Sequence, residues 1–200
     1  MNDLYKTISN HSKGQFKDRG SRFIALAFPV ISEDEIKEKI AQLRKEYHDA
    51  RHHCFAWRLG ADMKRYRVND DGEPSGSAGR PIYGQIQKWE LTDILVVVIR
   101  YFGGTLLGVG GLITAYKSAT AEALTNAEII EKRLEKKIEL QFPYEAMNGV
   151  MKIIKEFDLT FEDQHFDLNC PLQLKVWIRH IKEVSLRFSK IEGCKICSDE

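Results

Sequence analysis

The stretch Ile94-Leu95-Val96-Val97-Val98-Ile99 is continuously apolar, and it is followed by Arg100-Tyr101-Phe102-Gly103-Gly104-Thr105-Leu106-Leu107-Gly108-Val109-Gly110-Gly111. Six apolar residues without alternation predict a strand that is buried on both faces. The glycines after it predict a tight turn, and residues 112–126, rich in Ala, Ser and Thr, predict a helix that packs closely on a sheet. A buried strand, a glycine-rich turn and a helix start leave backbone N–H groups that can bind an anion.

A second glycine-rich segment lies upstream and reads Asp70-Asp71-Gly72-Glu73-Pro74-Ser75-Gly76-Ser77-Ala78-Gly79-Arg80-Pro81. Pro81 suits the first position of a helix, which we expect to run through Trp89. We expect both glycine-rich segments to meet at one surface, with free amide groups and Arg80 facing solvent. The glycines also suit a purely structural role, in which they permit positive φ in tight crossovers.

The other elements are predicted from apolar spacing and from capping residues. Ser32 and Glu35 form a capping box ahead of a helix that reaches about His48. Strands are expected at 3–10, 21–30, 51–59 and 64–68, with a turn region around Gly14 and Gly20.

Composition shifts to dense charge at residues 128–136, which predicts a boundary between domains 1–130 and 131–200. Beyond it we expect a strand at 137–142, a helix at 144–157, strands at 159–166 and 172–178, a helix at 182–191 and a strand at 194–197. This order, β-α-β-β-α-β, is the ferredoxin-like pattern, so the fold class is predicted to be α+β.

The bulk composition is that of an ordinary globular protein, with 200 residues, 43% hydrophobic and 30% charged residues and a formal charge of +1. The overall composition and net charge give no indication of a nucleic-acid or membrane partner. The N-terminus shows no signal peptide, and the run from Ile94 is far too short to cross a bilayer. Four cysteines without a secretory signal indicate reduced thiols, so a cytoplasmic location is expected.

Four strings of residues resemble the IMPACT/YigZ family, and the resemblance spans roughly residues 20–125: His52-His53-Cys54, Asp70 to Pro81, Arg100 to Gly104 and Gly110-Gly111-Leu112. It implies a first domain like ribosomal protein S5 domain 2, which is also the fold of domain IV of elongation factor G. The second domain would be ferredoxin-like, similar to domain V of that factor. Eukaryotic relatives add an RWD domain and restrain a stress-activated translation-initiation kinase. No such domain precedes the motifs here, so that partner is not carried over.

Two positions depart from the common pattern of the family. Many members have a lysine where this chain has Leu106, and an arginine where it has Thr114. Each change removes a positive charge from beside the candidate anion pocket, and one such charge at about 4 Å contributes several kcal/mol at intermediate dielectric. A tight phosphate site is therefore less expected here than in the family at large.

The candidate anion- or RNA-binding surface combines residues of strand ends with residues of both glycine-rich segments. Its members are His52, His53, Asp70, Asp71, Glu73, Ser75, Ser77, Arg80, Arg100, Tyr101, Gly103, Gly104, Gly108, Gly110 and Gly111. Among them, Arg100 can make a bidentate phosphate contact and Tyr101 can stack on a base.

The carboxylates of Asp70, Asp71 and Glu73 can hold Mg²⁺, but capping of turns with neutralisation by Arg80 is favoured. A nucleophilic Ser75 or Ser77 needs a neighbouring base, for which His52 and His53 are the candidates by chain order. His52 and Cys54 share one face of a strand without further ligands at suitable spacing, and Cys194-x-x-Cys197 has no second pair. We therefore predict no catalytic residue, no metal and no cofactor.

Three functions remain open. The favoured one is a translation-associated regulatory protein that binds the ribosome or RNA through the glycine-loop surface. The others are a hydrolase acting on a phosphorylated or peptide substrate, and a protein–protein interaction module in stress or translation control. No membrane partner is expected.

Overall fold

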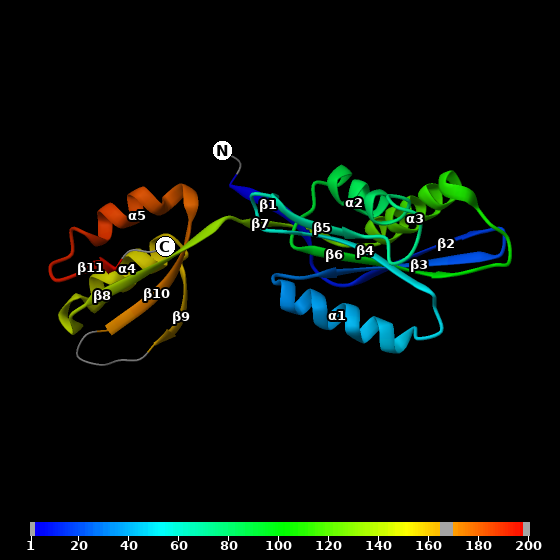
Figure 1. Cartoon of the computed structure of the whole chain (residues 1–200). Helices are drawn as coiled ribbons and strands as arrows, with labels where there is room; N and C mark the ends of the chain where they lie inside the picture. Colours follow the sequence, from blue (N-terminus) through cyan, green and yellow to red (C-terminus); the bar gives the residue numbers. More distant parts are fainter. Residues whose placement is uncertain (1–2, 165–169, 198–200) are drawn as a thin grey trace. The chain divides into compact units, whose positions relative to one another are not determined.

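The computed structural model describes residues 3–164 and 170–197 of an α+β protein (Figure 1). The chain divides into a large unit, Tyr5–Lys132, and a small unit made of Met1–Leu4 with Arg133–Glu200. Each unit has hydrophobic clusters of its own. No helix in the described ranges has the length and apolarity that crossing a bilayer would take.

The large unit is built on a five-stranded antiparallel sheet in the order β2-β3-β6-β4-β5. The strands are β2 (Ser12–Asp18), β3 (Ser21–Pro29), β4 (His52–Leu59), β5 (Arg65–Asn69) and β6 (Ile94–Tyr101). Strand β6 lies at the centre, and its residues 94–100 are all buried. The expectation of a strand covered on both faces is confirmed.

Helices cover both faces of this sheet (Figure 1). Helices α2 (Gly79–Lys88) and α3 (Gly108–Thr125) pack with Val96 and Val98 on one face, and α1 (Glu33–Glu46) packs with Leu95 and Val97 on the other. Alternate β6 side chains thus enter separate cores, which explains why the strand shows no polar face.

The predicted capping box is present at the start of α1. The Ser32 hydroxyl accepts from the Glu35 N–H at 3.2 Å, and the Glu35 carboxylate accepts from the Ile31 N–H at 2.8 Å. The helix ends at Glu46, two residues before the expected end.

Two predictions about the large unit are wrong. Residues 12–18 form the edge strand β2 and not a turn, because this strand packs small residues on α3: a Cβ on Gly14 would lie 2.2 Å from the Ala123 nitrogen. Because the contact is made by backbone atoms and small residues, the sequence of β2 lacks the alternation of apolar and polar residues that predicts a strand. Helix α3 begins at Gly108 and not near Leu112, because three glycines belong to its first turn.

Strands β1 (Leu4–Ile8) and β7 (Ile129–Arg133) pair in a separate two-stranded sheet. The segment that the sequence marks as a change of composition is therefore regular structure. Its charged side chains at Glu131, Lys132 and Arg133 are exposed.

The small unit follows the predicted order of elements. Its strands are β8 (Glu135–Phe142), β9 (Thr160–Gln164), β10 (Cys170–Trp177) and β11 (Lys195–Cys197), paired antiparallel in the order β11-β8-β10-β9. Helices α4 (Met147–Glu156) and α5 (Ile181–Phe188) follow the short 3₁₀ turns η1 (Tyr144–Ala146) and η2 (Ile178–His180). Residues 165 and 166 of the expected strand 159–166 lie outside the described residues.

Candidate functional site

Asp70 closes the first glycine-rich segment on itself. Its carboxylate accepts hydrogen bonds from the backbone N–H of Gly76 at 2.8 Å, of Ala78 at 3.0 Å and of Gly79 at 2.8 Å. Burial raises the pKa of this carboxyl group, but the three N–H donors outweigh it and hold the pKa below its usual value. The amides at the start of α2 are therefore occupied by the chain's own carboxylate.

Asp71 ties the same segment to α1 and β4. Its carboxylate accepts from the Arg44 guanidinium at 2.5 Å and from the His53 N–H at 2.7 Å, and its carbonyl lies 2.8 Å from His52 Nδ1. Asp71 has a φ of +43°, and the side-chain oxygen of Asn69 accepts its N–H at 2.7 Å. These contacts fix a strained turn against the sheet.

Glu73 connects the two glycine-rich segments from within. One oxygen, Oε1, accepts from Arg100 Nη1 at 2.7 Å and from the Tyr116 hydroxyl at 2.8 Å, and all three side chains are buried. Arg100 is the last buried residue of β6, and Tyr116 lies on α3. The two glycine-rich segments are therefore joined by one buried ion pair, between Glu73 of the first segment and Arg100 of the second.

Cys54 and His53 lie beside this network and are also buried. The Cys54 thiol donates to the Asp70 carbonyl at 3.0 Å and lies 3.2 Å from the Tyr116 hydroxyl; burial raises the pKa of both the thiol and the phenol. Burial, helped by the charge of Arg44, lowers the pKa of His53. Cys54 is thus a protonated thiol and not a thiolate nucleophile.

The second glycine-rich segment remains open to solvent. The N-cap residue of helix α3 is Leu107, and no side chain caps the first N–H groups of this helix. Every residue from Phe102 to Gly110 except Leu107 is exposed. A Cβ added at Gly104, Gly108 or Gly110 would meet no atom within 4 Å. The first N–H groups of an 18-residue helix therefore face solvent, where the helix dipole favours a negative charge.

Gly103 belongs to the same segment but has a structural role. A Cβ at this position would lie 2.0 Å from the carbonyl carbon of Gly20 in the β2–β3 turn, and the Gly103 N–H donates to Ser21 Oγ at 3.1 Å. This close approach places the β2–β3 turn, with the exposed Arg19, beside the second glycine-rich segment, whereas Arg22 and its cross-strand neighbour Lys17 face the α1 side of the sheet, where Arg22 lies over the Tyr101 ring. The sequence reasoning missed these residues because β2 was not recognised.

Exposed apolar side chains also surround the start of α3, which the sequence reasoning did not anticipate. Their exposed fractions are 48% for Phe102, 81% for Leu106, 53% for Val109 and 38% for Ile113. Leu106 is the residue from which this exposed apolar surface could have been predicted, because an apolar side chain in a glycine-rich loop has no core in which to pack.

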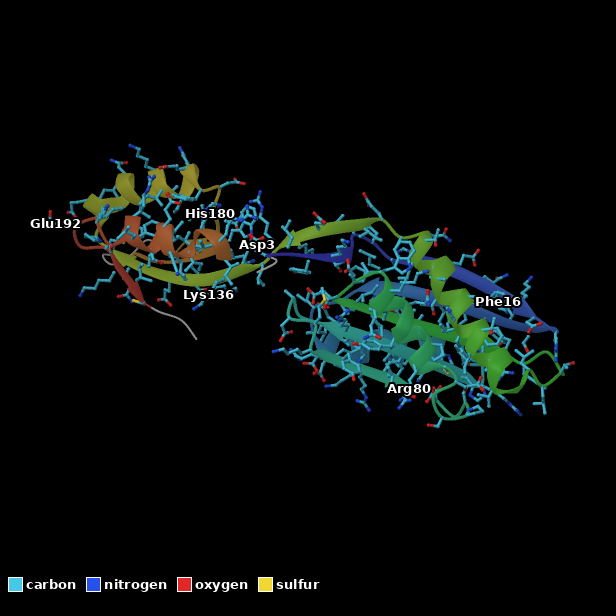
Figure 2. All side chains as sticks on the ribbon, turned by 90° about the horizontal axis from the view of Figure 1, so that it is seen from above. Asp3, Phe16, Arg80, Lys136, His180 and Glu192 are labelled. Atoms are coloured by element: carbon cyan, nitrogen blue, oxygen red, sulfur yellow. The ribbon has the colours of Figure 1, made fainter. Side chains whose placement is uncertain are left out.

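The remaining predicted site residues are dispersed. Ser77 is buried and donates to the Pro74 carbonyl at 2.6 Å, while Ser75 is exposed. Tyr101 donates to Asp49 at 2.9 Å on the α1 face of the sheet. Arg80 lies on the outside of the large unit (Figure 2), and among the described residues it has no ion pair or hydrogen bond through its side chain.

Within the described residues the predicted site residues form neither a serine–histidine pair nor a cluster of metal ligands. In the described part of the chain, neither serine of the first segment contacts a histidine, and no three His, Cys, Asp or Glu side chains gather as metal ligands. Asp70, Asp71 and Glu73 are each engaged by donors of the protein. What remains available to a ligand is the open start of α3.

The fold and the site define a two-unit α+β protein with an exposed, glycine-rich helix start. Residues 19–124 match the family description "Impact N-terminal domain". The chain belongs to the IMPACT family.

Relatives of known name align over most of the chain. IMPACT family member YvyE of Bacillus subtilis is 32% identical over 86% of this chain and 79% of its own length. IMPACT family member YigZ of Escherichia coli is 36% identical over 69% of each. A crystal structure of a hypothetical protein superposes with a TM-score of 0.79 at 27% identity, covering 100% of this chain and 99% of the other. The family resemblance noted in the sequence is thus confirmed.

Proposed function

We propose that this chain is a translation-associated regulatory protein that binds RNA, on its own or in the ribosome, through the start of α3. The surface concerned, the α3-start surface, comprises residues 102–111 with Arg19 of the neighbouring turn. The observation that carries the proposal is the uncapped, solvent-facing first turn of α3. Its N–H groups and the helix dipole suit a phosphate group.

Two further features suit a nucleic-acid strand. Phe102 is half exposed and offers a ring on which a base can stack, and the Arg100 guanidinium carbon lies 5.7 Å from the centre of that ring. Arg19 supplies positive charge at the neighbouring β2–β3 turn, and it forms no ion pair within the described residues. This cation partly replaces the charge that Leu106 and Thr114 remove.

Family membership supports the link to translation, since the resemblance implies a translation-factor-like pair of folds. We assign the large unit to the class of ribosomal protein S5 domain 2 and the small unit to the ferredoxin-like class, with the domain boundary near residue 130. The small unit's element order and its antiparallel sheet β11-β8-β10-β9 support the second assignment.

The test is binding of a labelled single-stranded RNA and of purified ribosomal subunits, followed by fluorescence anisotropy at increasing salt. Gly110→Asp places a carboxylate in the first turn of α3, where it stabilises the helix and repels a phosphate. Gly110→Ala is the matched control, because a Cβ there meets no atom. We expect the aspartate variant alone to lose about tenfold or more in affinity. Absence of RNA binding at low ionic strength, or equal affinity of both variants, would contradict the proposal.

The exposed apolar side chains favour a second candidate, a protein–protein interaction module. Leu106 is the most exposed of them, at 81%. The substitution Leu106→Lys separates the candidates, because it adds a cation for RNA and removes apolar area from a protein contact. Association that resists nuclease and disappears in Leu106→Lys would identify a protein partner.

A further inference from the structure

A hollow lies on the α1 face of the large unit, away from the α3-start surface. In the described part of the chain α1 alone covers this face of the five-stranded sheet, so the edge strand β2 is left partly uncovered (Figure 1). Between α1 and strands β2 and β3 there is a cavity of about 310 Å³ whose apolar lining includes Leu26 and Leu43. This volume is at the lower end of small-molecule sites, which suits a ligand of nucleotide size.

Two cations line this hollow from different elements, Lys13 from the start of β2 and Lys39 from the middle of α1. Lys37 pairs with Asp34 and Arg44 pairs with Asp71, so these two cations of α1 are engaged elsewhere. Within the described residues, Lys13 and Lys39 have no such pair. Two cations without a counter-ion at the rim of an apolar floor attract a phosphate or carboxylate group.

The hollow also has an aromatic wall. The rings of His11 and Phe28 are stacked, with 6.3 Å between their centres and 23° between their planes, and Lys39 Nζ lies 5.6 Å from the Phe28 ring. Half-exposed rings of this kind offer a face on which a planar ligand can stack. One carboxylate, that of Glu46, also lines the hollow and accepts hydrogen bonds from amino or hydroxyl groups.

We propose that this hollow binds a nucleotide. The base stacks on Phe28 and His11, the phosphate lies between Lys13 and Lys39, and Glu46 accepts from a ribose hydroxyl or a base amino group. A ligand with an anion alone would leave the aromatic wall unused, and a neutral ring would leave the two lysines unpaired. The site is distinct from the α3-start surface, because His11 and Lys13 lie at the opposite end of the β2–β3 hairpin from the Gly20 turn.

The test is a titration of the ¹⁵N-labelled full chain with the four common nucleoside 5′-monophosphates, followed by NMR. We expect the backbone amide signals of β2, of the end of β3 and of α1 to shift, with dissociation constants in the micromolar to millimolar range. Adenosine lacks the phosphate and ribose 5-phosphate lacks the base, so each should bind at least about tenfold more weakly than AMP.

Variants assign the binding to the hollow. Lys39→Gln and Phe28→Leu should each weaken AMP binding about five- to tenfold, by loss of charge and of stacking respectively. Lys88→Gln is the matched control, because Lys88 is an exposed lysine at the end of α2, on the other face of the sheet. The signals of the remaining residues report whether each variant is folded.

The proposal is overturned if no nucleotide shifts these amides at millimolar concentration, if ribose 5-phosphate binds as well as AMP, or if Lys88→Gln weakens binding as much as Lys39→Gln. A short RNA that shifts the same amides more tightly than AMP would identify the nucleotide as part of a strand, and an equal affinity would identify it as free; both satisfy the proposal. Gly110→Asp should leave AMP binding unchanged, so failure here and failure of the α3-start surface are separate results.

Discussion

The buried pair of Glu73 and Arg100 should determine the stability of the large unit. The Arg100 side chain is 7% exposed and that of Glu73 is 3% exposed, and Arg100 Nε already has no hydrogen-bond partner within the described residues. In Glu73→Gln the amide oxygen can still accept from Arg100 and Tyr116, but the guanidinium loses its counter-charge. Removal of one partner of a buried pair costs about 3–5 kcal/mol, and we expect about 3 kcal/mol because an acceptor is retained.

Equilibrium unfolding in urea, followed by tryptophan fluorescence, measures this loss. The background substitution Trp177→Phe removes the tryptophan of the small unit, so that Trp57 and Trp89 report on the large unit. With a urea dependence of about 2 kcal/mol per M, the midpoint should fall by about 1.5 M. The control Glu90→Gln breaks an exposed pair with Lys6 and should change stability by less than about 1 kcal/mol.

A second variant tests the reasoning behind the magnitude. The double substitution Glu73→Leu with Arg100→Leu removes both charges, so it should be more stable than Glu73→Gln even though it loses the hydrogen bond to Tyr116. The reasoning is refuted if Glu73→Gln unfolds at the wild-type midpoint, or if the double variant is the less stable of the two.

Three more predictions concern single positions. Asp70→Asn should destabilise the protein by about 1 kcal/mol at pH 7 through loss of a capping carboxylate. Because the pKa of Asp70 is lowered in the folded state, the wild-type advantage is present above the unfolded pKa and is lost as pH falls through the folded pKa. Urea unfolding of both proteins at pH 7 and at acid pH measures this difference. Gly103→Ala should destabilise by at least about 3 kcal/mol, because its Cβ would lie 2.0 Å from the Gly20 backbone, whereas Gly110→Ala should be neutral or stabilise by about 0.5–1 kcal/mol in the same assay. Cys54 should react with iodoacetamide only on unfolding, since it is buried with a raised pKa; mass spectrometry of labelled native protein would contradict this by detecting modified Cys54.

Local patterns identified most of the elements, because their signals lie within a few residues. The capping box at Ser32 and the continuous apolar run of β6 each predicted an element close to its observed bounds. Strand β2 was missed because its burial depends on Gly14 contacting the backbone at Ala123, more than a hundred residues away. A contact of backbone with backbone leaves no apolar side chain in the sequence.

The candidate site was harder to predict, because hydrogen bonds decide which atoms are free. Residue type alone marked Glu73 and Arg100 as ligands of a substrate or a phosphate, and the geometry pairs them with each other. The local sequence predicts only a turn at Phe102 and Leu106, because the exposure of these side chains is a property of the fold and not of the local sequence. The pocket beside His11 could not be foreseen without β2.

The two glycine-rich segments differ in whether a carboxylate of the chain accepts from the first N–H groups of the following helix. Each segment leads into a helix, and each helix has N–H groups in its first turn that need an acceptor. At α2 the acceptor is Asp70, which is part of the same segment, so its side chain occupies the place where a phosphate would bind. At α3 the segment from Phe102 to Gly111 contains no acidic residue, and Leu107 provides no side-chain cap. The missing acceptor is therefore one that a ligand can supply, and the absence of a carboxylate predicts an anion site better than the glycines do.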